Sequence, residues 1–397
     1  MPVHIPVLGN SLAIGIVSLL HIAFASVAVA FMILAPVTES LGRHKPHYTE
    51  LARSLTRFTL VTYTTSVVLA VIMIELLIGL FPLTNSWLFN RFRVPITFAL
   101  GAFLLQLLVL YPYYHFWQAI RAWSVGVHIL MGTVAAILVL VWVGVLDGIG
   151  SYMLTPVEQT SWHAVYNPTW IGLVLHRFVG NLIVGGFLLA GYAAWRLPRA
   201  GTNQDYYQVC LHLGMMVGMA CLVLQPFTGW FYARAIAQTV PVSYQQVVQG
   251  RYQGFVYLQF VLVGLLLIGS HIVIHGTSRF RARGAILATV VLCLSVILMV
   301  AMVGHPDARR FWTFAAVLIL AWSIRAWQPI LNHPSMDEWR SPWVRYLVIG
   351  LAIVSLSTYL TMGTIRETAR LPDTIHDFIS LTEDARAQEI IREAPHE

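Results

Sequence analysis

The sequence predicts an all-α membrane protein, a polytopic bundle of about ten transmembrane helices. Of its 397 residues, 58% are hydrophobic and 10% are charged, whereas a soluble domain carries about 25% charged residues. The mean hydropathy is +0.72, and apolar stretches of about 20 residues, the length that crosses a bilayer, recur along the chain. A soluble globular fold is therefore excluded. We assign the net charge of +7 to the loops of a membrane protein, and we expect no nucleic-acid partner.

Ten apolar spans follow one another along the chain. They cover residues 11–36, 57–80, 94–117, 123–146, 169–195, 207–231, 254–275, 284–303, 310–328 and 343–363. The eighth and ninth spans are separated by the short polar sequence HPDARR. After the last span, residues 364–397 form a polar tail with eight acidic residues against four arginines.

The arginines and lysines of the loops predict the orientation in the membrane. With the N-terminus outside, the inner loops hold thirteen Arg or Lys residues and the outer loops hold six. Because inner loops carry the excess of these residues, we expect the N-terminus on the periplasmic side. With ten spans, the acidic tail then lies on the same side.

The cysteines exclude some redox cofactors. Cys210, Cys221 and Cys293 all fall within apolar spans, and the sequence contains no CxxCH motif. A covalently attached c-type haem and a cysteine-bound cluster are therefore not expected. Such thiols are typical of packing between helices.

The fifth span, within Asn167–Arg196, carries His176 and Arg177 among apolar residues. An ionisable residue at membrane depth is costly and indicates a functional site. Glycines accompany the histidine, namely Gly180, Gly185, Gly186 and Gly191. Small residues beside a histidine suggest a flat group held against the helix, and imidazole is a common axial ligand of haem. The alternative is a histidine that is hydrogen-bonded to a neighbouring helix.

Further histidines lie within the spans, and the predicted topology sorts them into two layers. His21 and His176 lie at similar depths near the outer face, where Glu75, Met299 and Met302 also lie. The inner layer contains His115, His128, His212, His271 and His275. We therefore predict two layers of candidate haem ligands.

Each candidate has an alternative reading. For His128 and His212 the alternative is a polar contact between helices. His271 and His275 lie one turn apart on one helix face, so they do not bind opposite sides of one haem. One of them is a candidate ligand, and the other then extends to the membrane interface. Met299 and Met302 are more typical of packing.

Arg177 is expected to neutralise a haem propionate or to pair with Glu75. Its alternative is a place in a water-filled cleft.

Five motifs occur in one order along the first six spans. SLAIGIVSLLHIAFASVAVAFMIL contains His21, and IMIELLIGLFPLTNSW contains Glu75, Asn85 and Trp87. FRVPITFALGAFLLQ follows, then NP…H…GGF…G..AW at 167–195 with His176, and WFYARAIAQTVPVSYQQVVQG comes last. Together they resemble subunit I of cytochrome bd-type quinol oxidases over about 240 residues. The resemblance implies haem ligation by His21 and low-spin haem ligation by His176, and it implies the start of a quinol-binding loop in the last motif.

The departures from that family concern oxygen and quinol chemistry. Gln106 stands where the family's third helix has a glutamate, and an amide does not relay protons as a carboxylate does. Ser243 and Val248 stand where the quinol loop has Lys and Glu, and this loop is short. Phe260 falls near the place of the family's methionine ligand, and the GRxPW-type motif is missing. We therefore separate an oxidase-like region (1–235), divergent transmembrane helices (236–363) and the acidic tail (364–397).

The sequence thus predicts a membrane electron-transfer subunit of a respiratory redox complex in the bacterial inner membrane. Its expected cofactor is haem b, one or more per chain, with quinone as a second candidate ligand. Its expected partners are other membrane subunits and a c-type cytochrome that docks on the acidic tail. That tail is either an amphipathic helix or a solvated disordered segment. The alternatives are a divergent bd-type terminal oxidase and a haem-free anchor or scaffold.

Overall fold

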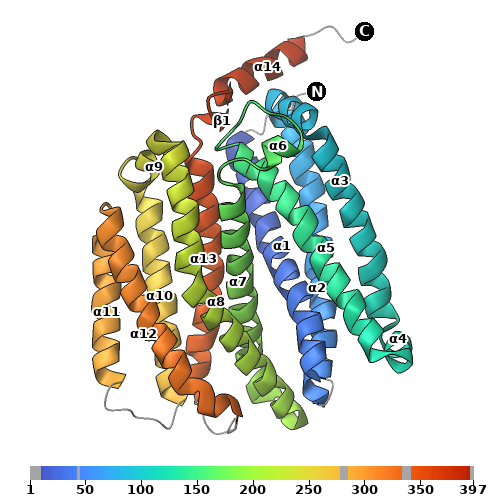
Figure 1. Cartoon of the computed structure of the whole chain (residues 1–397), viewed down its shortest axis with the longest axis vertical. Coiled ribbons are helices and arrows are strands. Elements are labelled where there is room, and N and C mark those ends of the chain that lie inside the picture. The colour runs from blue at the N-terminus through green and yellow to red at the C-terminus, as the bar shows by residue number, and fades with distance from the viewer. Residues whose placement is uncertain (1–9, 43–44, 278–284, 333–340, 394–397) are drawn as a thin grey trace.

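The structure, a computed structural model, describes residues 10–42, 45–277, 285–332 and 341–393. Within these residues ten long helices form a bundle (Figure 1). They are α1 (Asn10–Leu41), α2 (Pro46–Leu80), α3 (Pro82–His115), α5 (Val125–Tyr152), α7 (Trp170–Arg196), α8 (Gln204–Thr239), α10 (Gln253–Thr277), α11 (Ala285–Ala301), α12 (Pro306–Asn332) and α13 (Pro342–Thr368). Each predicted span falls within or largely overlaps one of them, which confirms the predicted fold class.

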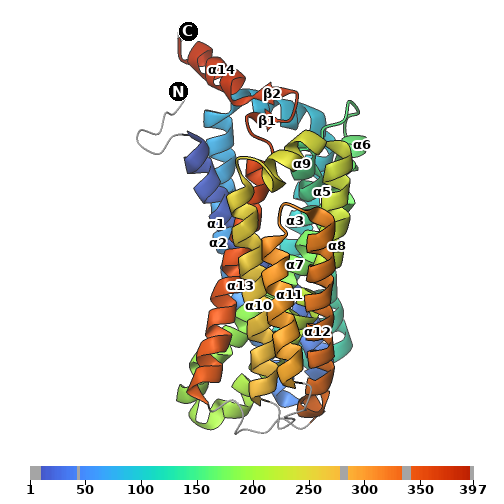
Figure 2. The ribbon, with the colours of Figure 1, turned by 90° about the vertical axis from the view of Figure 1, so that its left-hand side faces the viewer.

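The short elements gather at the two ends of the bundle. They are α4 (Trp117–Trp123), α6 (Trp162–Val165), α9 (Pro241–Val248), two 3-10 turns (Leu197–Arg199 and Gly201–Asn203), β1 (Asp373–Ile375), β2 (Ile379–Ser380) and α14 (Leu381–Glu393). Figures 1 and 2 place α6, α9, the strands and α14 at one end, called here the α14 end. The opposite end, where α4 lies, is called the α4 end.

Length and composition support a membrane location. Eight of the described helices are long and apolar enough to cross a bilayer, namely α1, α2, α3, α5, α7, α8, α10 and α13. The apolar helix α11 is shorter, with 17 residues. The chain is therefore a multi-pass membrane protein.

The bundle has α7 at its centre (Figure 1). The helices α1, α2, α3 and α5 pack together on one side, and α10, α11, α12 and α13 pack on the other. The helix α7 contacts α8, α13 and α1. Residues of α7 and α8 accordingly form much of the largest buried apolar cluster.

Glycines let the central helices approach closely. A Cβ added at Gly186 would lie 2.5 Å from the backbone nitrogen of Gly218 on α8, and one at Gly185 would lie 2.4 Å from the Cβ of Ala30 on α1. One at Gly191 would lie 2.6 Å from the Cβ of Ala352 on α13. Close backbone approach at small residues is a common way to pack membrane helices. These three glycines thus serve helix packing, which corrects the expectation that they face a flat group.

The tail is ordered from residue 369 to residue 393. The strands β1 and β2 form an antiparallel hairpin, and α14 lies across the ends of α2 and α3 (Figure 1). The buried carboxylate of Asp384 accepts hydrogen bonds from the backbone N–H groups of Leu83 and Thr84, at 2.9 and 3.1 Å. Asp384 thus satisfies two free N–H groups at the start of α3. Of the two alternatives for the tail, the structure supports the helix.

Candidate functional site

One ring nitrogen of His21, on α1, is hydrogen-bonded within the protein. Its Nδ1 lies 2.9 Å from the backbone carbonyl oxygen of Ser66 on α2 and 3.2 Å from the Ser66 hydroxyl. A carbonyl oxygen only accepts, so Nδ1 carries the proton. Its Nε2 has no hydrogen-bond partner among the described residues. Histidines that bind metals commonly have this arrangement, in which the other ring nitrogen donates to a carbonyl.

His176 lies against α8. The Gln225 side-chain nitrogen is 3.1 Å from its Nδ1, 3.3 Å from its Nε2 and 3.2 Å from its backbone oxygen, and the Thr228 hydroxyl is 3.4 Å from Nδ1. The ring stacks on Tyr232 at 6.0 Å between centroids. Gly229 leaves room for the ring, because a Cβ there would lie 3.1 Å from Cε1 of His176. An amide nitrogen has two hydrogens, so Gln225 does not satisfy all three of these His176 atoms at once. The side-chain oxygen of Gln225 is itself buried without a hydrogen-bond partner among the described residues.

His21 and His176 lie at the same level of the bundle. The helices α1 and α7 both run away from the α14 end (Figure 1), and they touch where Ala30 meets Gly185. Each histidine precedes this contact by nine residues, which is about 13.5 Å along a helix at 1.5 Å per residue. The hydrogen bonds of His21 are with α2, whereas those of His176 are with α8. The two imidazoles thus occupy one layer in two separate settings.

Arg177 forms an ion pair with Asp147 of α5. Asp147 is 3% exposed, and the arginine side chain is 20% exposed. Glu75 is exposed on the outside of the bundle. The expected pairing of Arg177 with Glu75 is therefore wrong, because the partner of Arg177 is Asp147 inside the bundle. Asp147 was not predicted from the sequence, because it lies one residue beyond the predicted fourth span.

Gln106 on α3 is fully buried. Its side-chain oxygen accepts hydrogen bonds from the Tyr63 hydroxyl at 3.0 Å and from the Trp142 indole at 2.6 Å. Its nitrogen donates to the sulfur of Met32 at 2.8 Å. The amide is thus held by α1, α2 and α5 together.

His128 belongs to a buried polar cluster near the α4 end. Its Nδ1 lies 2.7 and 2.9 Å from the two carboxylate oxygens of Glu39, and its Nε2 lies 3.1 Å from the backbone oxygen of Tyr113. Glu39 also accepts from the Tyr113 hydroxyl at 3.0 Å, and Arg121 lies 3.4 Å away. Both ring nitrogens are engaged by protein, which favours the alternative of a polar contact between helices. Glu39 was not among the residues predicted from the sequence.

Two further inner histidines, His212 and His271, also have hydrogen-bond partners in the protein, whereas His275 has none among the described residues. His212 is buried, and its Nδ1 lies 2.9 Å from the backbone oxygen of Gln208. The nitrogens of His271 lie 2.8 Å from the Ser323 hydroxyl and 2.9 Å from the Thr289 hydroxyl. His275 packs edge-on against His271 at 4.4 Å between centroids. Its two nitrogens are buried without a partner among the described residues. Met299 is fully buried in the core, as its packing alternative requires.

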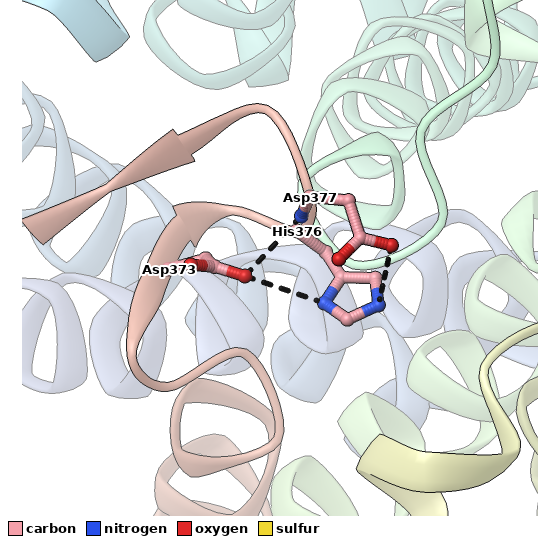
Figure 3. Close-up of side chains that lie close together, drawn as sticks. All are labelled: Asp373, His376 and Asp377. Atoms are coloured by element: carbon pink, nitrogen blue, oxygen red, sulfur yellow. Dashed lines mark hydrogen bonds and ion pairs between the residues drawn. The ribbon is translucent and has the colours of Figure 1, made fainter.

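One further group was not expected from the sequence. His376 on the hairpin between β1 and β2 lies between Asp373 and Asp377, with nitrogen–oxygen distances of 3.6 and 3.4 Å (Figure 3). Within the described residues these three side chains are close enough to hold a metal ion. Each carboxylate faces a different ring nitrogen, and Asp377 is 80% exposed. The arrangement is thus explained as surface ion pairing.

The donor set in the layer of His21 and His176 fits a haem protein. Imidazole is a common axial ligand, His21 presents a free Nε2 beside a fixed Nδ1, and His176 lies beside an orphaned amide oxygen. Arg177 supplies a cation one residue away from His176. Fold and side chains together define a class: a multi-pass helical membrane protein with imidazoles inside the bundle.

Comparison with known proteins gives the family. The model of the family "Cytochrome bd terminal oxidase subunit I" matches residues 11–388, and the chain belongs to this family. The match continues beyond residue 250, where the last of the sequence motifs ends, through α10 to α13 and into α14. Proteins of this family bind haem and transfer electrons in membranes. The search among curated proteins gave no match.

A solved structure supports the same fold. The bd oxidase from Geobacillus thermodenitrificans is similar with a TM-score of 0.54 and 15% sequence identity. The alignment covers 90% of this chain and 97% of that chain. At this identity the likeness shows the fold alone.

Proposed function

We propose that the chain is an electron-transfer subunit with b-type haem in a larger respiratory redox complex. The observation that carries the proposal is the hydrogen bond from Nδ1 of His21 to the Ser66 carbonyl. It fixes the ring and leaves Nε2 as the free ligand atom. His176 is the second proposed ligand. The two serve separate haems, because their rings lie against different helices.

Haem bound in this layer supplies a carrier that takes up and releases one electron. The protein orients the two imidazoles through Ser66 and Gln225. Asp147 holds the guanidinium of Arg177, the residue next to His176 in the chain, and a guanidinium has further N–H groups that suit a haem propionate. Among the inner histidines, the ring nitrogens of His128 and His271 have protein partners. This supports leaving His128 and His271 out of the proposed ligand set, and His212 remains only a candidate there.

Electron transfer is favoured over oxygen reduction by the surroundings of Gln106. An oxidase must deliver protons to its oxygen site, and the amide here is bonded to Tyr63, Trp142 and Met32. A neutral amide held in this way does not relay protons as a carboxylate does. The alternative function, a divergent terminal oxidase with quinol or a cytochrome as donor, is favoured by the family match.

The proposal includes a location and partners. The charge pattern of the loops supports the bacterial inner membrane with the α14 end on the periplasmic side. Other membrane subunits are proposed partners, because the family forms oxidase complexes. A basic c-type cytochrome is proposed to dock on exposed acids of the tail such as Asp377, Glu383 and Glu389. The segment around α9, which resembles the start of a quinol-binding loop, is short. Quinone therefore remains a candidate ligand of the complex.

The test is a haem count on the protein purified with its native partners. A pyridine haemochrome assay and a reduced-minus-oxidised spectrum are expected to show b haem. His21→Ala and His176→Ala are each expected to remove or alter one haem signal, whereas His163→Ala, at an exposed position of α6, leaves the spectrum unchanged. A colourless protein would overturn the proposal in favour of a scaffold. Oxygen uptake that depends on His21 would favour the terminal oxidase.

A further inference from the structure

The contacts of His128 determine where its protons lie. Its Nε2 faces the backbone oxygen of Tyr113, which only accepts hydrogen bonds. That nitrogen therefore carries a hydrogen, since two lone pairs at 3.1 Å would repel each other. Its Nδ1 faces both oxygens of the Glu39 carboxyl group. A neutral imidazole with its hydrogen on Nε2 would present a bare Nδ1 to a carboxylate.

A hydrogen bond between His128 and Glu39 thus requires one more proton. Either the imidazole is doubly protonated and donates to a carboxylate, or Glu39 is a carboxylic acid and donates to Nδ1. Both states have the same net charge, and they differ only in the position of the proton along the bond of 2.7 Å. The Tyr113 hydroxyl supports either state by donating to the other carboxyl oxygen.

The pair is closed off from solvent. Both side chains are 0% exposed, and the rings of Tyr113 and Trp117 pack against the imidazole at 4.4 and 4.3 Å between centroids. Gly132 on α5 makes this packing possible, because a Cβ there would lie 2.8 Å from the Tyr113 ring. An unmade hydrogen bond at such a place costs about 1–3 kcal/mol, and more for a charged group. The geometry therefore strongly favours the state with the extra proton.

One neighbouring charge acts against an extra proton. The guanidinium of Arg121 on α4 lies 3.4 Å from the Glu39 carboxylate, but its side chain is 21% exposed, and its Nε makes no hydrogen bond among the described residues. Arg121 is also bound to the Thr49 hydroxyl of α2 at 3.2 Å. Partial solvation weakens its field, whereas the bonds of His128 are direct. Within the described residues, the other polar partner of the pair is Tyr113 of α3.

We propose that Glu39 and His128 form a proton-binding site at the α4 end, which holds one proton between the carboxyl group and the imidazole in addition to the hydrogen on Nε2. The ligand is a proton, and Arg121 of α4 is the partly exposed charged group beside the pair. This inference rests on the packing of α1, α3, α4 and α5, and it holds whether or not His21 and His176 bind haem.

The test locates the hydrogens in the intact protein. The full chain with its native partners is labelled with ¹⁵N-histidine and ¹³C-glutamate and studied by solid-state NMR at pH 7.5. The His128 signals are identified by their dipolar contact with a glutamate carboxyl carbon. This assignment needs no variant, because His128 is the histidine paired with a glutamate in the described residues. The infrared spectrum is recorded in parallel, and Glu39→Gln identifies any band of a protonated carboxyl group.

Two results support the site. The first is a His128 ring with both nitrogens protonated, and the second is a carboxylic acid band that Glu39→Gln removes. His271 is the matched internal control, because it is a buried histidine with hydroxyl partners and no carboxylate. It is expected to show one protonated and one bare nitrogen, and His271→Gln identifies its signals. A His128 ring with one bare nitrogen, together with no carboxylic acid band sensitive to Glu39→Gln, would overturn the proposal.

Discussion

Arg177 of α7 and Asp147 of α5 form an ion pair inside the bundle. The pair lies beside His176 and links α7 to the group of α1, α2, α3 and α5. Asp147 is almost completely buried, at 3% exposure. In a membrane bundle neither charge is stable without a partner, so the pair is needed to keep the proposed haem layer intact.

Asp147→Asn is therefore expected to destabilise the protein. Breaking a buried pair leaves an uncompensated charge and costs about 3–5 kcal/mol. Thermal unfolding of the detergent-solubilised protein measures this loss. The control is Asp307→Asn, which removes a pair with Arg310 at 3.0 Å in which the acid is 96% exposed; exposed pairs contribute about 0–1 kcal/mol. Equal effects of the two variants would contradict a supporting role for Asp147.

Gly229→Ala is expected to displace the imidazole of His176. Its Cβ would lie 3.1 Å from Cε1 of His176 and 3.3 Å from Nδ1, so the ring must move. If His176 binds haem, the reduced-minus-oxidised spectrum shifts or loses intensity. Gly350→Ala on α13 is the control, because its Cβ meets nothing within 4 Å. An unchanged spectrum in a haem-loaded Gly229→Ala protein would argue against His176 as a ligand.

Gln106→Leu is expected to lower the free energy of unfolding. The Tyr63 hydroxyl and the Trp142 indole lose their shared acceptor, and each buried donor left unpaired costs about 1–3 kcal/mol. Thermal unfolding again gives the measurement. Gln118→Leu, at an exposed position of α4, is expected to change stability little. A Gln106→Leu protein as stable as the Gln118→Leu protein would mean that water replaces the amide.

Asp384→Ala is expected to release α14 from the ends of α2 and α3. The variant leaves two backbone N–H groups at the start of α3 without their acceptor, and loss of such a cap costs about 0.5–2 kcal/mol. Limited proteolysis should then remove the C-terminal segment several times faster than in the wild type. Asp377→Ala, at an 80% exposed position, serves as the comparison and should leave the cleavage rate unchanged.

The start of α14 is expected to loosen at low pH. Glu383 accepts from the backbone N–H of Ser380 at 2.7 Å, and the Ser380 hydroxyl accepts from the N–H of Glu383 at 3.2 Å, which is a capping box. The hydrogen bonds from the Ser380 backbone and side chain lower the pKa of Glu383. A lowered pKa in the folded state means that the stabilisation is complete above the unfolded pKa and is lost as pH falls through the folded value.

Hydrogen exchange of residues 381–393 at neutral pH and below about pH 4, near the ordinary pKa of glutamate, measures this effect after correction for the intrinsic exchange rate. Protection is expected to fall with pH in the wild type. Glu383→Gln removes the ionisable group, so its protection should depend less on pH. The same pH dependence in both proteins would assign the loosening to Asp384 or another acid.

The sequence by itself determined the fold class and the approximate location of all ten long helices. Apolar spans of about 20 residues leave few other structures in a membrane, because backbone groups must be paired within each helix. The order of the motifs around His21 and His176 likewise predicted the family. These are properties of single segments, so no knowledge of their packing was needed.

Only the tertiary structure decided which side chains meet. Arg177 pairs with Asp147 rather than Glu75 because Glu75 lies on the outer surface of α2. His128 meets Glu39 because α1 and α5 pack at the α4 end. The rotation of each helix about its own axis determines which side chains meet. In lipid both faces of a helix are apolar, so the hydrophobic periodicity of the sequence does not reveal that rotation. The glycines of α7 are another case, because their use became clear only from Ala30, Gly218 and Ala352 on the neighbouring helices.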